Sequence, residues 1–457
     1  MQQFTLSQAA AWTGGTCTAD PVITRVVRDA REAGPGSLFV AIQGERFDGH
    51  DFIGQAVERG AAAVLTHRKE ETYPIPALYV ADTRQALLDL AGGYRAQFDC
   101  PVVAVTGSVG KTTTKEMIAA VLSERYETLK TEGNLNNTIG MPFTALRMDE
   151  NTEAAVFEMG MSGFGEIAAM AACGQPNIAV ITMIGTSHIE FLGSREGICR
   201  AKMEILEGLA ARGGIAVLNG DEPLLWDQKD RLFGRIVWFG QENPACDFRA
   251  EDISCTDGTL RFTMIWPEGR QTVEVASQGT HNVMNALAAA ACGWLLGLEA
   301  DEIADGLAAY RPIGLREQRY EKNGFSIYED CYNASPDSME AALRVLGSMP
   351  GARRIAVLGG MGELGSYAPE GHRRAGRAAA QYADRIFAYG ANTEYLREGA
   401  LEGGMAPEDV TCFDTHEALA EALRRAAQPG DALLFKGSRA MKMENVLKLF
   451  LGEEVEK

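Results

Sequence analysis

The chain lacks the patterns that mark several classes of protein. Its nine cysteines form no Cys-x-x-Cys pair, and their odd number cannot pair completely. We therefore expect reduced, buried thiols of a cytoplasmic protein rather than a disulfide framework or a zinc site. The opening residues, Met1-Gln2-Gln3-Phe4, show no basic segment followed by an apolar core, so no secretory signal is expected.

Positive charge is also scarce. The net charge of −19 repels nucleic acid and anionic membranes, so we expect neither as a general partner. An anionic substrate would need a local group of cations. The uncharged stretch over residues 283–298 is shorter than the roughly 20 apolar residues of a transmembrane helix. It predicts a buried helix and no membrane insertion.

The apolar segments divide the chain into three α/β blocks. At roughly 150 residues per domain, 457 residues predict two to four domains. Short apolar runs separated by helical stretches predict strands at 37–42, 62–65, 77–80, 102–105, 154–157, 178–181, 215–218, 355–358, 385–389 and 432–435. Weaker alternation at 248–250, 259–265 and 272–275 predicts an antiparallel extension at the edge of the central sheet.

We therefore predict three domains of the α/β class. A small N-terminal α/β domain covers residues 1–100. A central domain over residues 101–312 has a mostly parallel sheet with helices on both faces, and a C-terminal Rossmann-like domain covers residues 313–457.

Residues 104–113, Ala-Val-Thr-Gly-Ser-Val-Gly-Lys-Thr-Thr, follow a predicted strand and open a predicted helix. Such a turn points backbone N–H groups and the positive end of the helix dipole at one place. Lys111 adds a cation for phosphates, and the Thr112 hydroxyl can reach Mg²⁺. Val105 stands where the eight-residue P-loop has its first glycine. The context nevertheless predicts a site for a nucleoside triphosphate.

Other polar residues follow the predicted strands of the central block. Glu158 comes directly after one strand, His188 follows the next by a short turn, and Asn219 and Asp221 follow a third. Ligands of open α/β sheets bind at the carboxyl ends of the strands. A carboxylate and an imidazole there are suitable ligands for Mg²⁺ ions that bridge phosphates.

Three further segments leave alternatives open. Lys202 lies in an amphipathic helix and, on its own, is best interpreted as a solvated lysine. Asn282 and Asn285 share a helix face, where they could bind a heterocycle or cap the helix. The G-x-G-x-x-G run at 360–365 follows a strand, but Pro369 comes too soon for a clean helix and Asp384 precedes the next strand. We therefore do not expect a dinucleotide there.

Together these motifs resemble the Mur ligases, a family of ATP-dependent amide-forming enzymes of peptidoglycan precursor synthesis. The likeness extends over nearly the whole chain. The short phosphate loop of the chain, Gly-x-x-Gly-Lys-Thr, is the form that this family has. It is carried by FVAIQGERFDGHDF at 39–52, GNLNNTIGMP at 133–142, DCYNASPDSM at 330–339, GMGELG at 360–365 and KGSR at 436–439.

The resemblance implies roles for individual residues. The residues that bind the phosphates of ATP would be Gly107, Ser108, Val109, Gly110, Lys111, Thr112 and Thr113. Thr112 and Glu158 would bind one Mg²⁺, and His188 a second. Lys202 falls where the family carries a carbamylated lysine, whose carbamate would help to hold a metal ion. Asn285, with Asn282 or Asn137, would face adenine.

The outer blocks would complete the site. Arg316 and Asp330 would close over ATP from the third block, and Arg316 would act in catalysis with Lys111, Lys202 and His188. The candidates for substrate binding are Asp29, Arg31, Arg46, Asn333 and Ser335, with Arg28 as a further cation. Three residues differ from those usual in the family motifs: Ala30, Cys331 and Ser335. These differences concern how the substrates are bound and not which reaction is catalysed.

Within the family, the resemblance is to the branch that adds a dipeptide. It implies a cytoplasmic, monomeric enzyme that joins D-alanyl-D-alanine to UDP-N-acetylmuramoyl-tripeptide through an acyl phosphate, using ATP and two Mg²⁺ ions. One alternative is a related ligase that adds a single amino acid, although the Asp-Asn-Pro-Arg-like acceptor box of such enzymes is missing. Another is a P-loop protein that binds ATP without ligation.

Overall fold

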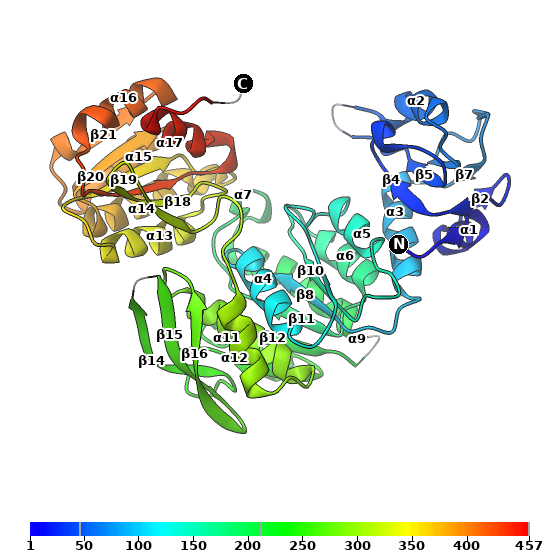
Figure 1. Ribbon diagram of the computed structural model, residues 1–457, viewed down its shortest axis with the longest axis horizontal. Helices are drawn as coiled ribbons and strands as arrows, with labels where there is room; N and C mark the ends of the chain where they lie inside the picture. The colour runs from blue at the N-terminus through cyan, green and yellow to red at the C-terminus, as the bar shows by residue number, and fades with distance from the viewer. Residues whose placement is uncertain (45–46, 211–212, 257, 456–457) are drawn as a thin grey trace.

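The computed structural model describes residues 1–44, 47–210, 213–256 and 258–455. Figure 1 shows three α/β units arranged in chain order, with the N-terminal unit at one end and the C-terminal unit at the other. This confirms the predicted fold class. The boundaries at 100/101 and 312/313 stay our proposal.

The N-terminal unit is built on a five-stranded sheet in which only the edge strand β2 runs antiparallel to its neighbour. In sheet order the strands are β2 (Thr16–Cys17), β7 (Ala77–Tyr79), β6 (Ala63–Thr66), β5 (Ser37–Val40) and β4 (Arg25–Val27). A two-stranded ribbon of β1 (Phe4–Thr5) and β3 (Val22–Ile23) lies beside it. The helices are α1 (Leu6–Thr13), α2 (Ile53–Glu58) and α3 (Thr83–Arg95).

The central unit contains a six-stranded sheet in which all neighbouring strands are parallel. Its order is β13 (Arg235–Phe239), β12 (Ile215–Asn219), β11 (Ile178–Ile181), β8 (Val102–Thr106), β10 (Ala154–Glu158) and β9 (Thr128–Lys130). The two edge strands, β9 and β13, lie outside the four strands that the sequence predicted.

Helices cover both faces of this sheet, as predicted. Alternate residues of each strand point to opposite faces, so Val103 and Val105 pack against α4 (Lys111–Leu122), α11 (Asn282–Leu295) and α12 (Ala300–Ala309). Val102 and Ala104 face the other layer, which contains α3, α5 (Gly140–Ala145), α6 (Glu166–Gly174) and α8 (Arg195–Met203). Short helices α7 (Ile189–Leu192), α9 (Glu207–Ala210) and α10 (Pro223–Trp226) lie in the connections.

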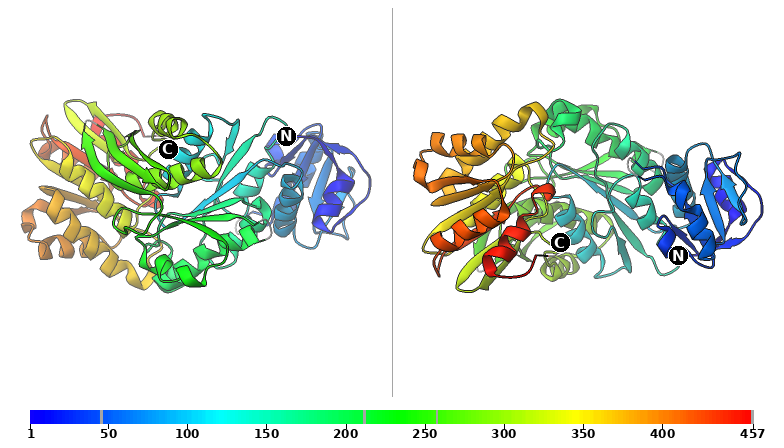
Figure 2. Two further views of the ribbon diagram at one scale, coloured as in Figure 1. Left: turned by 90° about the horizontal axis from the view of Figure 1, so that it is seen from below. Right: turned by 90° about the horizontal axis from the view of Figure 1, so that it is seen from above.

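Helix α3 joins the N-terminal and central units. Its residues Leu87 and Leu90 belong to one buried cluster that includes Leu38 and Leu65 of the N-terminal sheet and also reaches the central sheet. The apolar core is therefore continuous across the proposed boundary at residue 100. Figure 2 shows α3 between the two sheets.

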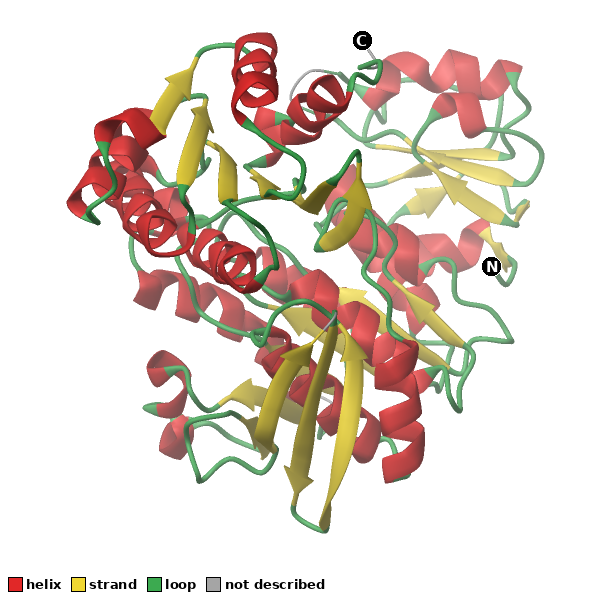
Figure 3. Cartoon of the chain, turned by 60° about the vertical axis from the view of Figure 1, so that its left-hand side comes forward, coloured by secondary structure: helices red, strands yellow, loops and turns green. Residues whose placement is uncertain are grey.

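Our prediction for residues 248–276 is wrong in its placement. β14 (Arg249–Thr256), β15 (Thr259–Trp266) and β16 (Gly269–Ala276) form a separate three-stranded antiparallel sheet and do not extend the edge of the parallel one. Figure 3 shows it standing apart from the parallel strands. Phe262 and Val273 of this sheet join the core beside α11 and α12. The link to the parallel sheet is a single parallel bridge between Phe248, just before β14, and Phe239 of β13.

The C-terminal unit has a six-stranded sheet that is parallel except for its first pair, β17 and β18. In order the strands are β17 (Gln318–Lys322), β18 (Phe325–Asp330), β22 (Ala432–Lys436), β19 (Arg354–Gly359), β20 (Arg385–Tyr389) and β21 (Val410–Phe413). One helical layer comprises α13 (Pro336–Ser348), α14 (Ala368–Tyr382) and α15 (Thr393–Glu402), and the other α16 (His416–Ala426) and α17 (Met443–Leu451).

Two local expectations were also wrong. Pro369 does not prevent a helix after the glycine-rich segment, because α14 begins at Ala368 and holds the proline in its first turn, where no intrahelical donor is needed. The nine cysteines are all free, but Cys255 and Cys412 are exposed rather than buried. The apolar stretch after residue 283 does form a buried helix, α11.

The close pairing of α14 with α15 predicts a sensitive position at Gly376. A Cβ atom there would lie 2.0 Å from the Leu396 carbonyl oxygen, so we expect Gly376→Ala to destabilise the protein by about 1–3 kcal/mol. Gly54→Ala in α2 is the matched control, because its Cβ meets nothing within 4 Å. Scanning calorimetry should show a lower apparent Tm for Gly376→Ala alone; equal Tm values would contradict the tight helix contact.

Candidate functional site

The glycine-rich turn between β8 and α4 is held by the segment that follows β11. The backbone N–H of Ser108 donates to the Met183 carbonyl (2.9 Å), and the Thr182 hydroxyl donates to the Val109 carbonyl (2.6 Å). Lys111 Nζ donates to the Gly107 carbonyl (2.8 Å). The turn is thus organised before a ligand arrives, with the buried hydroxyl of Ser108 lacking a hydrogen-bond partner.

Two positions in this turn require glycine. A Cβ on Gly107 would lie 1.8 Å from Thr182 Oγ1. Gly110 has a left-handed backbone (φ 85°) at the start of α4, and its Cβ would lie 2.6 Å from Asn285 Oδ1. The strand, turn and helix therefore fit together only with a bare backbone at these points.

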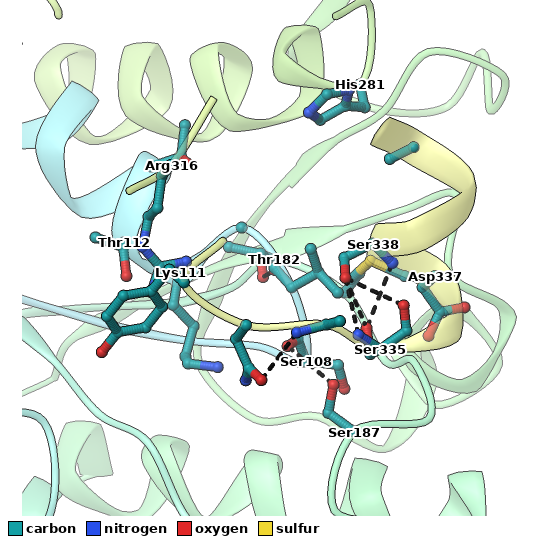
Figure 4. A pocket seen from close by; sticks show the side chains of 18 of the residues that line it. Ser108, Lys111, Thr112, Thr182, Ser187, His281, Arg316, Ser335, Asp337 and Ser338 are labelled. Atoms are coloured by element: carbon teal, nitrogen blue, oxygen red, sulfur yellow. Dashed lines mark hydrogen bonds between the residues drawn. The ribbon is translucent and has the colours of Figure 1, made fainter. Parts of the chain in front are cut away.

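A cavity of about 680 Å³ opens beside this turn, between the central and C-terminal units. Figure 4 shows Lys111, Thr112 and Arg316 on one side of it and Ser335, Asp337 and Ser338 on another. The predicted site residues that line the cavity are Ser108, Val109, Gly110, Lys111, Thr112, Thr113, Asn137, Glu158, His188, Asn285, Arg316, Asp330, Asn333 and Ser335. Asn219 and Asp221, which follow β12, line it as well. Residues from the ends of β8, β10, β11 and β12 therefore meet there.

Other predicted residues lie elsewhere. Gly107, Lys202 and Asn282 are not part of the cavity wall. Asp29 and Arg31 lie on the N-terminal unit, where they pair with each other (2.6 Å) and the Arg31 side chain is 78% exposed. This contact with Arg31 lowers the pKa of Asp29 to about 2. Arg46 lies outside the described residues.

Glu158 is almost fully buried at the end of β10. Its Oε1 accepts from Asn136 Nδ2 (2.7 Å), whereas Oε2 has no hydrogen-bond partner and lies 3.7 Å from Lys115 Nζ. Lys115 is itself buried and pairs with Glu116 (2.9 Å). Asn136 therefore holds Oε1, whereas Oε2 lies within ion-pair distance of Lys115 and keeps hydrogen-bonding capacity for a ligand.

Cations gather around the phosphate loop. Burial lowers the pKa of Lys111, an effect that Glu158 partly opposes and Arg316 reinforces. Lys202 lies in α8 and is 1% exposed, so the interpretation as a solvated lysine is wrong. Burial, followed by the charge of Lys111, holds the pKa of Lys202 well below its usual range. No ion-pair partner of Lys202 occurs within the described ranges.

The two asparagines of α11 occupy different places in one hydrogen-bonded chain. Asn285 Oδ1 accepts from the Thr114 hydroxyl (2.9 Å), and its Nδ2 donates to Asn282 Oδ1 (2.6 Å). Asn282 Nδ2 in turn donates to Glu317 (2.7 Å) on the linker to the C-terminal unit. Asn285 thus faces the cavity, while Asn282 supports it from behind.

Asn137 and Ser335 each have a local structural role as well. Asn137 Oδ1 accepts from the backbone N–H of Gly140 (2.7 Å) at the start of α5. Ser335 caps α13 through Ser338. Both still line the cavity, but part of their hydrogen-bonding capacity is already used.

The C-terminal unit contributes residues that the sequence reasoning did not single out. Lys436, at the end of β22, is buried, pairs with Asp330 and donates to the Asn333 carbonyl (3.0 Å). Asp337 accepts from both the backbone N–H and the hydroxyl of Thr186 (3.0 and 3.1 Å). Lys436 follows a predicted strand, so its position was a usable signal; nothing in the sequence indicated the contact of Asp337.

Sequence profiles of three domains match the chain in order: "Mur ligase family, catalytic domain" over residues 22–95, "Mur ligase middle domain" over 105–293 and "Mur ligase, glutamate ligase domain" over 316–439.

The chain belongs to the Mur ligase family.

Relatives of this Mur ligase align with nearly all of its sequence. It is 41% identical to UDP-N-acetylmuramoyl-tripeptide–D-alanyl-D-alanine ligase of Bacillus subtilis, over 93% of each chain, and 38% identical to the enzyme of that name from Escherichia coli, over 98% of each. A crystal structure of MurF from Acinetobacter baumannii superposes with a TM-score of 0.92 at 33% identity, covering 99% of this chain and 100% of that one.

A second solved structure carries a nucleotide. MurF from Thermotoga maritima in complex with ADP has a TM-score of 0.85 at 32% identity, with 94% of this chain and 97% of that chain covered. Separately, none of the helices in the described part of this Mur ligase has the length and apolar character needed to cross a membrane.

The contact between Gly110 and Asn285 gives a test of the nucleotide site. Gly110→Ala places a Cβ against Asn285 Oδ1, so we expect ADP to bind at least about tenfold more weakly, or about 1.4 kcal/mol. Gly165→Ala is the matched control, because Gly165 has a similar φ of 82° but its Cβ meets nothing within 4 Å. Isothermal titration calorimetry measures both; equal ADP affinities would contradict the assignment.

Proposed function

We propose that this chain is the ATP-dependent ligase that joins D-alanyl-D-alanine to the terminal carboxylate of UDP-N-acetylmuramoyl-tripeptide in the synthesis of peptidoglycan precursors. The observation that carries the proposal is the single cavity in which the phosphate loop, Glu158 and His188 meet Arg316, Asp330 and Asn333. The two relatives above, which bear the name of this reaction, support the same choice of substrates.

The nucleotide would bind along the phosphate loop. The N-terminus of α4 presents backbone N–H groups to the phosphates, and Lys111 can move from the Gly107 carbonyl to a phosphate oxygen. Arg316 lies with its guanidinium 3.8 Å from the centre of the Tyr332 ring, which holds it in place without neutralising it. Asn285 is positioned to contact the adenine ring.

The side chains at the cavity wall include suitable ligands for Mg²⁺. The unpartnered Oε2 of Glu158 and the hydroxyl of Thr112 are oxygen donors at the cavity wall, as Mg²⁺ prefers. We propose that they hold one ion, and that His188 and a carbamate on Lys202 hold a second. Mg²⁺ held by these residues would supply positive charge that offsets the negative charge of the phosphates.

The chain's own residues would then guide two displacements. A carboxylate oxygen of the tripeptide attacks the γ-phosphorus and ADP leaves, while Lys111 and Arg316 stabilise the charge that develops on the phosphate. The amine of D-alanyl-D-alanine attacks the resulting acyl phosphate, loses a proton and expels phosphate. The C-terminal unit covers this space and would protect the acyl phosphate from water.

The remaining assignments follow from the proposed reaction. The N-terminal unit would bind the UDP-sugar, with Asp29, Arg31 and Arg46 as candidates and Asn333 and Ser335 on the acceptor side. Arg28 stays a further candidate cation; its guanidinium lies 5.7 Å from the centre of the Phe143 ring in α5 of the central unit. We propose a monomer that works in the cytoplasm, where ATP is supplied.

The acceptor distinguishes this proposal from its alternatives. With ATP and UDP-N-acetylmuramoyl-tripeptide present, ADP should be released with D-alanyl-D-alanine and not with lysine, diaminopimelate or glutamate. A coupled ADP assay over this panel is the measurement. Faster turnover with a single amino acid would assign the chain to another branch of the family, and ATP binding without amine-dependent release would favour a non-catalytic P-loop protein.

Carbamylation of Lys202 is separately testable. Its buried, weakly basic amine is favoured to be neutral, which is the form that adds CO₂. Enzyme equilibrated with ¹³C-bicarbonate should give a carbamate carbon signal that is absent from Lys202→Ala, and that variant should lose activity by several orders of magnitude. Lys229→Ala is the exposed-lysine control. An active Lys202→Ala enzyme without a signal difference would contradict the assignment.

A further inference from the structure

The C-terminal unit contacts the loop that carries His188 at two points. Asp337 of α13 accepts from the Thr186 N–H and hydroxyl, as described above, and Arg374 supports Asp337 from behind (3.0 Å). Glu363, in the loop after β19, places Oε2 2.5 Å from His188 Nδ1. The two atoms are in close contact, although their geometry is not that of an aligned hydrogen bond.

The backbone on both sides of the second contact is unusual. His188 has φ 64° and Glu363 has φ 59°, so both occupy the left-handed region that non-glycine residues rarely adopt. Such conformations are unfavourable for non-glycine residues and persist where the surroundings impose them. A backbone contact adds to the fit, since the Glu190 N–H donates to the Glu363 carbonyl (3.4 Å).

The loop after β19 and helix α7 are tightly packed against each other. A Cβ on Gly365 would lie 2.9 Å from Glu190 Cγ, so the loop after β19 lies directly against α7. In Figure 1, α7 is the central-unit helix beside the C-terminal sheet. Glu363 is nevertheless 51% exposed, so its side chain is not required to fill a core.

We propose that Glu363 is a positioning residue that orients the imidazole of His188 across the contact between the two units. Because a carboxylate can only accept, contact with Glu363 favours the His188 tautomer that carries its proton on Nδ1. Nε2 is then left with a lone pair for a cation in the cavity. Carboxylates that orient a ligating histidine commonly work in this way.

Asp337 would act with Glu363 by holding Thr186, two residues before His188. Two carboxylates of the C-terminal unit then hold the loop, one at Thr186 and one at His188. Because these contacts exist only while the two units are docked, orientation of His188 depends on docking. This inference rests on the proposed ligase function, since it assigns Glu363 a part in that reaction.

The first experiment observes His188 directly. The protein has six histidines, so ¹⁵N-histidine labelling with His188→Gln for assignment can identify the His188 signals in the enzyme without nucleotide or metal. We expect the Nδ1–H tautomer in wild type, a tautomer mixture in Glu363→Ala, and partial restoration in Glu363→Gln, whose amide oxygen can still accept. Glu408→Ala, an exposed carboxylate of the same unit, should leave the signals unchanged.

The second measurement is kinetic. In the dipeptide ligation assay kcat should fall by about 10- to 100-fold in Glu363→Ala, with less loss in Glu363→Gln, while KM for ATP changes little. An unchanged His188 tautomer in Glu363→Ala, or a changed tautomer with normal kcat, would overturn the inference. A wild-type enzyme without dipeptide ligation would instead overturn the proposed function, whatever the histidine spectra show.

Discussion

The parallel pairing of β8 with its two neighbours determines where the chemistry of this protein can occur. On one side Glu158 of β10 lies opposite Val105, and on the other Ile181 of β11 lies opposite Thr106. Because the three strands run in the same direction, the segments that follow them leave from a single edge of the sheet. The packing that buries both faces of the strands therefore also brings together the phosphate loop, the Glu158 carboxylate and the His188 loop.

The electrostatics of that edge follow from its burial. Lys111, Lys202 and Arg316 approach one another where water is scarce, and the carboxylates nearest to them are partly committed to other partners, as Glu158 is to Asn136. A triphosphate supplies the missing negative charge. A carbamate on Lys202 would remove one of the competing positive charges by converting it into an anion. The positive charges of the site are therefore better balanced when its negatively charged ligands are bound than when they are absent.

The sequence predicted those parts of the structure that depend on local pattern. Alternating and continuous apolar runs located the four inner strands of the central sheet, and the Gly-Lys-Thr turn located the start of α4. Strand β9 was missed because it has only three residues, of which one is apolar. Strand β13 has five residues with the apolar run Ile-Val-Trp-Phe, so the sequence carried a usable signal that was overlooked. The separate sheet of β14, β15 and β16 was misplaced because alternation indicates a strand but not its partner. Lys202 was misjudged because burial of a lysine depends on tertiary packing.

Contacts between the units are the part that no local pattern could supply. Glu363 belongs to a glycine-rich run whose spacing suggested, and then failed to support, a dinucleotide fingerprint; its partner His188 lies far away in sequence and on another sheet. The two meet because the loop after β19 lies against the segment after β11 where the two units pack together. Neither unit alone contains all the residues that line the cavity. An arrangement in which one unit orients a residue of the other therefore links exclusion of water to assembly of the site. This linkage suits a reaction with an acyl phosphate intermediate, which must not form while the cavity is open.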